Sequence, residues 1–169
     1  PQEYIKRGRA FAQALSRKMV TIASTREGED ELFIQAIQKQ IGRAQSQGVL
    51  LEDQVLFCLV PRHPQRFDDV ARKLESAGLS YMRRSTFVQT GEMSAVNARM
   101  ITQGRQLVLL GDSIGEMPRY YAASHVAIIA GSFLPFGGQN LIEACATGVP
   151  VLVGPHTENF SQAVLDAIQ

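Results

Sequence analysis

The chain has 169 residues, of which 45% are hydrophobic and 20% are charged, and its formal net charge is +1. This composition fits one globular domain with a sizeable core, and the even spread of 17 basic and 16 acidic residues excludes a basic stripe for nucleic acid. No apolar run approaches the roughly 20 residues that cross a membrane, and no signal peptide is recognisable.

Short apolar runs alternate with amphipathic stretches along the chain. In chain order, the patterns predict helices or strands as follows: a helix over residues 4–17, a strand over 19–23, a helix over 30–44, a strand over 55–60, a helix over 64–77, a short strand over 79–82, a strand over 107–110, a helix over 116–123, a strand over 126–130, a helix over 140–147, a strand over 151–153 and a final helix. Residues 85–106 are polar and mixed, and they predict either a short helix over 94–101 or a mobile loop.

Strands that are apolar on both faces and alternate with helices predict an α/β fold, a Rossmann-like parallel sheet with helices on both faces. Such sheets bind ligands beyond the carboxyl ends of their strands. The segments that follow the strands are rich in Gly, Pro, Ser or charge, and we expect them to meet at one rim: residues 24–29, 61–64, 111–116, 131–140 and 154–160.

One of these segments pairs two glycines, Gly137 and Gly138, with Asn140 and Glu143. Paired glycines let a backbone approach a ligand closely, and a helix start offers free N–H groups to a phosphate. The pattern therefore predicts a cradle for the phosphate and ribose of a nucleotide. The alternative is a capping box with Asn140 at the N-cap and Glu143 at N3, which needs no ligand.

The loop over residues 61–64 places Arg62 between prolines at the end of an apolar strand. Its planar fork suits a phosphate or a carboxylate, whereas the alternative is a solvated loop arginine. In the segment over 111–117, glycines allow backbone approach and Ile114 or Met117 offers an apolar surface to a base. The alternative there is a strand-to-helix turn capped by Asp112 or Ser113.

The first predicted strand ends in Ser24, Thr25, Arg26 and Glu27, which are candidates for a sugar contact or for the edge of a cleft facing a partner domain. The acids that follow, Asp30 and Glu31 among them, suit the positive end of a helix dipole.

Several site types are not expected. The first strand lacks the G-x-G-x-x-G fingerprint of dinucleotide binding, and neither a P-loop nor a G-x-S-x-G elbow is present. Cys58 and Cys145 are expected to be buried small hydrophobes in a reducing compartment. Three histidines, His63, His125 and His156, lie too far apart in sequence to predict a structural metal.

Five segments taken together carry a family resemblance: residues 23–31 (ASTREGEDE), 59–67 (LVPRHPQRF), 111–117 (GDSIGEM), 137–143 (GGQNLIE) and 150–160 (PVLVGPHTENF). In this order the chain resembles the carboxyl-terminal half of the 3-deoxy-D-manno-octulosonic acid (Kdo) transferases of lipopolysaccharide synthesis. The resemblance implies a two-domain GT-B glycosyltransferase with CMP-Kdo as donor, a lipid A precursor as acceptor, inversion at the anomeric centre, and neither a metal nor another cofactor.

The resemblance also implies roles for residues. Arg62 would contact the phosphate or carboxylate, the turn at Gly137 and Gly138 the phosphate, and Glu143 with Asn140 the ribose, while residues 111–117 would line the cytosine. The implied donor-binding set is Arg62, His63, Gly111, Ser113, Ile114, Gly115, Met117, Ser132, Gly137, Gly138, Asn140 and Glu143. CMP-Kdo carries one phosphodiester and one carboxylate, so it needs two anion sites rather than a diphosphate clamp.

The chain begins at Pro1 and stops at Gln169 within an apolar helical pattern, so we expect it to be part of a longer protein. The resemblance implies that residues 1–169 form a single CMP-Kdo-binding domain, and that the acceptor domain, with the acidic general base and the membrane contact, lies in a missing amino-terminal half. The full-length protein would act at the cytoplasmic face of the bacterial inner membrane, whereas this part would be soluble and inactive alone.

The chain departs from the family at Gln139 and Arg26, each of which stands where a histidine is familiar. Two rivals remain open. One is another GT-B domain that binds a UDP-sugar, from a transferase or a UDP-N-acetylglucosamine 2-epimerase, and the other is a Rossmann-like module without enzyme activity that binds a protein partner.

Overall fold

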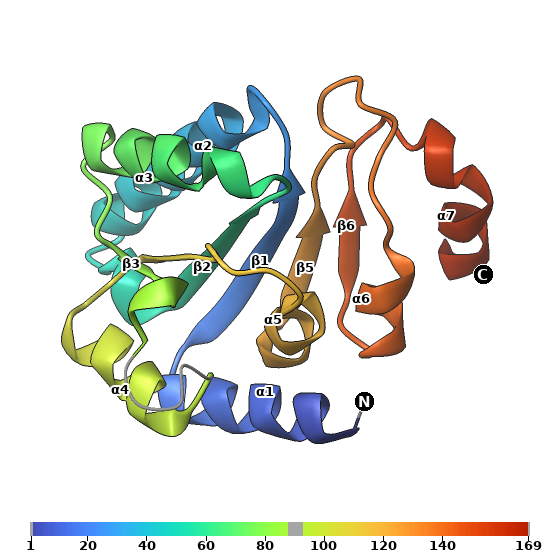
Figure 1. Cartoon of the computed structure of the whole chain (residues 1–169). Coiled ribbons are helices and arrows are strands. Elements are labelled where there is room, and N and C mark those ends of the chain that lie inside the picture. Colours follow the sequence, from blue (N-terminus) through green and yellow to red (C-terminus); the bar gives the residue numbers. More distant parts are fainter. Residues whose placement is uncertain (1, 88–92, 169) are drawn as a thin grey trace.

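The computed structural model describes residues 2–87 and 93–168. Its centre is a six-stranded sheet in the order β3-β4-β2-β1-β5-β6 (Figure 1). Every paired strand runs parallel to its neighbour, as predicted. The strands are β1 (Lys18–Thr25), β2 (Val55–Pro61), β3 (Tyr81–Arg83), β4 (Val108–Leu110), β5 (Val126–Ile129) and β6 (Val151–Val153).

Helices cover both faces of the sheet, which confirms the predicted class. On one face α1 (Gln2–Leu15) contacts α4 (Ala95–Gln103) and α5 (Met117–Ala123), and on the other α2 (Glu29–Ser46) contacts α3 (Phe67–Ser76) (Figure 1). The short helix α6 (Ile142–Ala146) and α7 (Ser161–Ile168) pack around β5 and β6. Short 3-10 turns are η1 (Leu51–Asp53), η2 (Pro64–Arg66), η3 (Arg84–Thr86) and η4 (Glu158–Phe160).

Strand β2 is largely buried on both faces, and its successive side chains point to opposite sides of the sheet. In β2, Leu56 and Cys58 pack with Phe11 of α1, whereas Leu59 packs with Phe33 of α2. A continuous apolar run over residues 55–60 therefore fills two cores at once.

The connections leave β1 and β5 in opposite directions. After β1 the chain passes through α2 to β2 on one side, and after β5 it passes through α6 to β6 on the other. Since β1 and β5 are hydrogen-bonded neighbours, the gap between their carboxyl ends is the topological switch point, where open parallel sheets bind ligands. The arrowheads of β1, β2, β5 and β6 point to this upper rim in Figure 1.

Several observed boundaries differ from the predicted ones. The helix expected over 64–77 begins as η2 and becomes α3 only at Phe67. The strand expected over 79–82 lies at Tyr81–Arg83. The helix expected over 94–101 is α4, which Ser94 caps by accepting a hydrogen bond from the Asn97 N–H. The loop alternative for residues 85–106 falls partly on 88–92, outside the described residues.

Among the described residues, each helix is too short or too polar to span a lipid bilayer.

Candidate functional site

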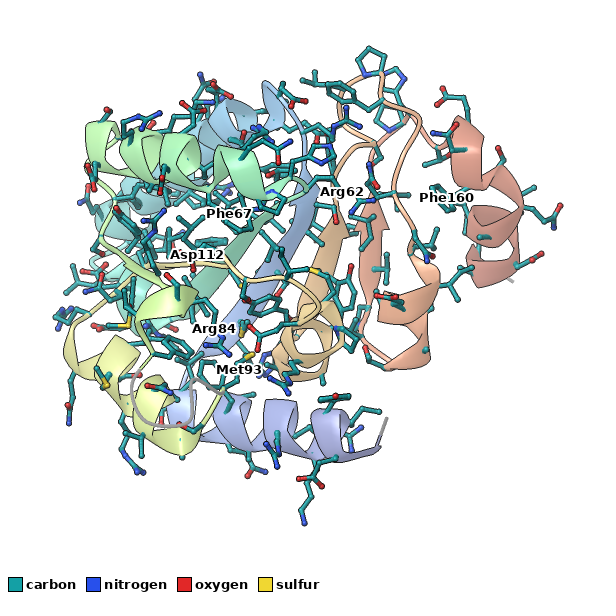
Figure 2. All side chains as sticks on the ribbon, viewed as in Figure 1. Arg62, Phe67, Arg84, Met93, Asp112 and Phe160 are labelled. Atoms are coloured by element: carbon teal, nitrogen blue, oxygen red, sulfur yellow. The ribbon has the colours of Figure 1, made fainter. Side chains whose placement is uncertain are left out.

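A cavity of about 290 Å³ opens where the loops after β1, β2 and β4 meet. Its lining contains seven of the residues predicted for donor binding or for the cleft edge: Ser24, Arg62, His63, Ser113, Ile114, Gly115 and Met117. In Figure 2 Arg62 lies at the upper rim, near the carboxyl ends of the strands. A larger hollow of about 420 Å³ lies beside Lys18 and His125, at the amino ends of the strands, which is the wrong edge for a ligand site of this fold.

Two arginines follow β2, and the structure gives them different surroundings. Arg66 is buried, donates to the Thr25 carbonyl at 2.8 Å and forms an ion pair with Asp30. Arg62 is exposed at the cavity, and its backbone N–H donates to the same Thr25 carbonyl at 3.0 Å. The fold therefore uses Arg66 to join β1 to the loop after β2, whereas the Arg62 side chain is exposed and lines the cavity.

Asp30 has a larger structural role than the helix-dipole interpretation predicted. Its fully buried carboxylate accepts a hydrogen bond from the Thr25 hydroxyl at 2.6 Å in addition to the ion pair with Arg66. Burial raises the pKa of Asp30, and Thr25 and Arg66 partly offset that rise. Thr25 is itself buried, so its side chain stabilises the end of β1 and does not line the cavity.

The loop between β4 and α5 presents Ile114 at the cavity, with 78% of its surface exposed. The Ser113 side chain is fixed by two hydrogen-bond partners, since its hydroxyl lies 2.8 Å from the Tyr120 hydroxyl and donates to Glu116. Glu116 is the residue before α5 and makes no side-chain cap, while Asp112 accepts from the Ser85 N–H at 2.7 Å. The alternative interpretation of this segment, a helix cap by Asp112 or Ser113, is therefore wrong.

The two glycines of this loop have different physical roles. A Cβ on Gly111 would lie 2.7 Å from Val60 Cγ2 and 3.3 Å from Tyr120 Cζ, so Gly111 is required by packing beneath the loop. Gly115 has a φ of +76° and open space around the position of a Cβ. Of the pair, only Gly115 offers an accessible backbone on the cavity side.

The glycine-rich turn after β5 is packed tightly, both within itself and against residues 156–160. Gly137 and Gly138 have φ values of +82° and +88°, a conformation that favours glycine. A Cβ on Gly137 would overlap Asn159, and one on Gly138 would lie 3.2 Å from the His156 carbonyl oxygen. These glycines therefore let the 156–160 segment pack against the turn. In addition, the Gly138 N–H donates to the Gly131 carbonyl at 2.7 Å.

The capping box that was the alternative interpretation of Asn140 and Glu143 does not form. Helix α6 begins at Ile142, and Leu141 is its N-cap with no side-chain cap. The Asn140 Oδ1 instead accepts from the Ile142 N–H at 2.9 Å, because an Asn side chain readily bonds the backbone two residues on. The Asn140 and Glu143 side chains are exposed. Burial, and then the charge of Glu143, raise the pKa of Tyr121 beneath them.

Ser132 and Arg26 lie within the switch-point region but outside the cavity lining. Ser132 is 1% exposed, and its hydroxyl donates to the Ile129 carbonyl at 2.6 Å and accepts from the Gly154 N–H at 2.8 Å. It therefore ties β5 to the loop after β6 in this conformation. The Arg26 guanidinium carbon lies 4.5 Å from the centre of the Phe136 ring, and Glu27 beside it is exposed.

Sequence reasoning missed Glu29, the first residue of α2. Its carboxylate is fully buried and accepts hydrogen bonds from the backbone N–H groups of Arg26 and Gly131 at 2.9 and 2.7 Å. In the sequence Glu29 is one acid among several at a helix start, so no local signal separates it from a dipole partner.

Within residues 2–87 and 93–168, no group of three or more His, Cys, Asp or Glu side chains has a geometry that holds a metal ion.

Comparisons with known proteins identify close similarity. The chain is 50% identical over 169 residues to a 3-deoxy-D-manno-octulosonic acid transferase of Bordetella pertussis, covering 99% of this chain and 36% of that protein. It is 35% identical over 140 residues to the enzyme of the same name in Haemophilus influenzae, covering 83% of this chain and 28% of that protein. The chain thus spans about a third of the length of these relatives. No protein-family model matches it.

A solved structure matches nearly the whole fold. The crystal structure of the C-terminal CMP-Kdo binding domain of WaaA from Acinetobacter baumannii superposes with a TM-score of 0.79 at 30% identity. The match covers 99% of this chain and 79% of that domain.

Proposed function

The chain belongs to the family of Kdo transferases, and we propose that it forms the part of such an enzyme that binds CMP-Kdo, the sugar donor for lipopolysaccharide synthesis. The similarity to a solved CMP-Kdo binding domain supports this role. The acceptor half then lies elsewhere in the full-length protein.

The observation that carries the proposal is the cavity at the carboxyl ends of the strands, with the exposed Arg62 beside the exposed Ile114. A guanidinium binds a phosphodiester or a carboxylate through two parallel N–H donors, and an aliphatic side chain packs on the face of a base. A nucleoside monophosphate has both of the matching groups, an anionic phosphate and a flat base.

The remaining contacts are proposed from the family resemblance. Arg62 binds the phosphate or the sugar carboxylate, and Ile114 with Met117 packs on the cytosine. Across the switch point, the turn at Gly137 faces the phosphate and the exposed Glu143 binds the ribose hydroxyls.

In the proposed reaction of the full-length enzyme, a hydroxyl of a lipid A precursor attacks the anomeric carbon of Kdo. The bond from that carbon to the phosphate oxygen breaks, the electron pair leaves with CMP, and the configuration inverts. A general base outside this chain takes the proton from the acceptor. Arg62 stabilises the negative charge that grows on the leaving phosphate. This chain alone binds the donor without transferring it.

Because the acceptor is a lipid precursor, we place the full-length enzyme at the cytoplasmic face of the bacterial inner membrane. Fractionation of cells that produce the full-length protein tests this location, and recovery of the enzyme in the periplasm would contradict it.

Calorimetric titration of this chain with CMP, CDP, UMP and UDP tests the donor assignment. We expect CMP to bind most tightly, and to bind equally well after treatment with EDTA. Tighter binding of UDP would instead favour a UDP-sugar domain, binding of none of the four would favour a protein-interaction module, and loss of binding in EDTA would show that a metal takes part.

A further inference from the structure

We propose that Glu29 is a positioning residue for donor binding, whose buried carboxylate holds the glycine-rich turn after β5 in the conformation that receives the nucleotide. This inference rests on the proposed function, because it concerns the same site. Glu29 is not among the residues that line the proposed cavity, so its effect on the donor passes through the backbone that it holds.

The carboxylate lies at a point where four backbone N–H groups converge. Its Oε2 accepts from Gly131 at 2.7 Å and from Arg26 at 2.9 Å. Its Oε1 accepts from Phe133 at 3.1 Å and from Leu134 at 3.4 Å. The side chain comes from the first residue of α2, and three of its four partners come from the loop after β5. One side chain therefore joins the two strands that flank the switch point.

The position of this turn determines the position of the proposed phosphate-binding glycines. The Gly131 carbonyl accepts from the Gly138 N–H at 2.7 Å, which closes the loop over residues 131–138. The Gly137 carbonyl in turn accepts from the Asn159 N–H at 3.0 Å. A shift of Gly131 would consequently move Gly137, Gly138 and the segment that packs on them.

The start of α2 is shaped for this contact. Gly28, directly before Glu29, has a φ of +86°, and a Cβ there would lie 3.1 Å from Leu134 Cδ1. The close approach of the two loops brings the Glu29 side chain beneath the turn with none of its surface exposed to solvent. A displaced carboxylate could not easily be replaced by water from outside.

Only an anionic side chain with two acceptor oxygens satisfies these donors. A carboxylate accepts at both oxygens, whereas the amide of Gln offers one oxygen and an NH₂ group that is itself a donor. In Glu29→Gln, at least one buried N–H of the turn would face another donor. Leaving a buried donor without a partner is costly, and here the loop can relieve that cost by moving.

The test compares Glu29→Gln with Leu74→Ala, a core substitution in α3 that removes a fully buried side chain belonging to neither loop. The measurements are CMP affinity by calorimetry, melting temperature, and amide hydrogen exchange over residues 131–138. We expect Glu29→Gln to weaken CMP binding about tenfold and to accelerate exchange in that segment. Leu74→Ala should lower the melting temperature while leaving CMP affinity within about twofold.

Equal effects of the two substitutions on CMP affinity, or unchanged exchange over residues 131–138 in Glu29→Gln, would overturn the proposal. If Glu29→Gln does not fold, Glu29→Asp takes its place, because it keeps the charge and draws the carboxylate back by one methylene. That variant should also exchange faster in the segment and bind CMP more weakly, and wild-type behaviour in both measurements would refute the role. Should the unaltered chain bind no CMP, the proposed function fails, while the exchange measurement still reports whether Glu29 orders the turn.

Discussion

The Glu29 carboxylate lies 2.7 Å from the backbone nitrogen of Gly131, although the two residues are 102 positions apart in the sequence. A second hydrogen bond joins β1 to the loop after β2, where the Thr25 carbonyl accepts from the backbone N–H of Arg62. The segment over residues 25–29, from the end of β1 to the start of α2, therefore contacts both elements of the proposed site, the cavity loop at Arg62 and the turn that contains Gly137. Neither element would keep its geometry if the end of β1 moved.

Arg62→Ala should weaken CMP binding by about 1.5–3 kcal/mol, the usual contribution of a hydrogen bond to a charged group. The expected loss is roughly 10- to 150-fold in the dissociation constant. Because the Arg62 side chain is exposed, the melting temperature should stay almost unchanged. Calorimetric titration with CMP and a thermal melt measure the two quantities.

Arg72→Ala is the matched control for Arg62. The Arg72 side chain is 69% exposed on α3 and forms a 3.6 Å ion pair with Asp69, so its removal deletes the same charge outside the cavity. If both substitutions weakened CMP binding equally, Arg62 would act through the net charge of the chain and not through contact with the ligand.

Much of the fold could be predicted from local patterns. The apolar run over residues 55–60 predicts β2 correctly, because a strand buried on both faces needs apolar residues at every position. The position of Arg62 at the cavity follows from the same logic, since parallel strands all end at one rim. These features depend on short segments of sequence and on one rule of topology.

Other features depend on contacts between distant segments, which no local pattern records. The donors that Glu29 binds include backbone groups more than 100 residues later, and backbone groups carry no sequence signature. The turn at Asn140 was ambiguous for another reason, because an Asn before a helix serves equally as an N-cap or as the start of an Asx turn. Gly111 was assigned to ligand approach, but Val60 and Tyr120 occupy the space of its missing Cβ.

Glu143→Ala should weaken CMP binding if the exposed carboxylate binds the ribose hydroxyls, with a loss of about 1.5–3 kcal/mol for hydrogen bonds to a charged group. A ligand without those hydroxyls, 2′,3′-dideoxy-CMP, should bind the variant and the unaltered chain equally, since the lost partner is then absent on both sides. Asp166→Asn, which neutralises an exposed carboxylate on α7, is the control for charge. A loss of affinity of the same size for the dideoxy ligand would refute the ribose contact.

Gly111→Ala should destabilise the fold by about 1–3 kcal/mol, because its methyl group would press on Val60 and Tyr120 in a filled core. Gly42→Ala is expected to act in the opposite direction. Gly42 lies inside α2 with open space at the position of its Cβ, so alanine should stabilise the helix by about 0.5–1 kcal/mol. Urea unfolding of the two variants measures both changes in the free energy of unfolding. An unchanged stability of Gly111→Ala would show that Val60 and Tyr120 can move to accommodate the methyl group.

The stability of the chain should depend on the protonation of His125, at the opposite edge of the sheet from the proposed site. The Met19 N–H donates to the His125 Nδ1 at 3.2 Å, which requires that nitrogen to be unprotonated. Burial and then the neighbouring charge of Lys18 lower the pKa of His125 below 6.5. The unfolded chain therefore binds more protons than the folded chain as the pH falls through this range. The stabilisation is accordingly present above the unfolded pKa and is lost as pH decreases through the folded pKa.

His125→Asn keeps an acceptor oxygen for the Met19 N–H and does not titrate. Thermal melts between about pH 7.5 and about pH 5 should show a larger loss of melting temperature in the unaltered chain than in His125→Asn. Carboxylates elsewhere titrate alike in both proteins and cancel in the comparison, so parallel curves would mean that His125 does not contribute to the pH dependence.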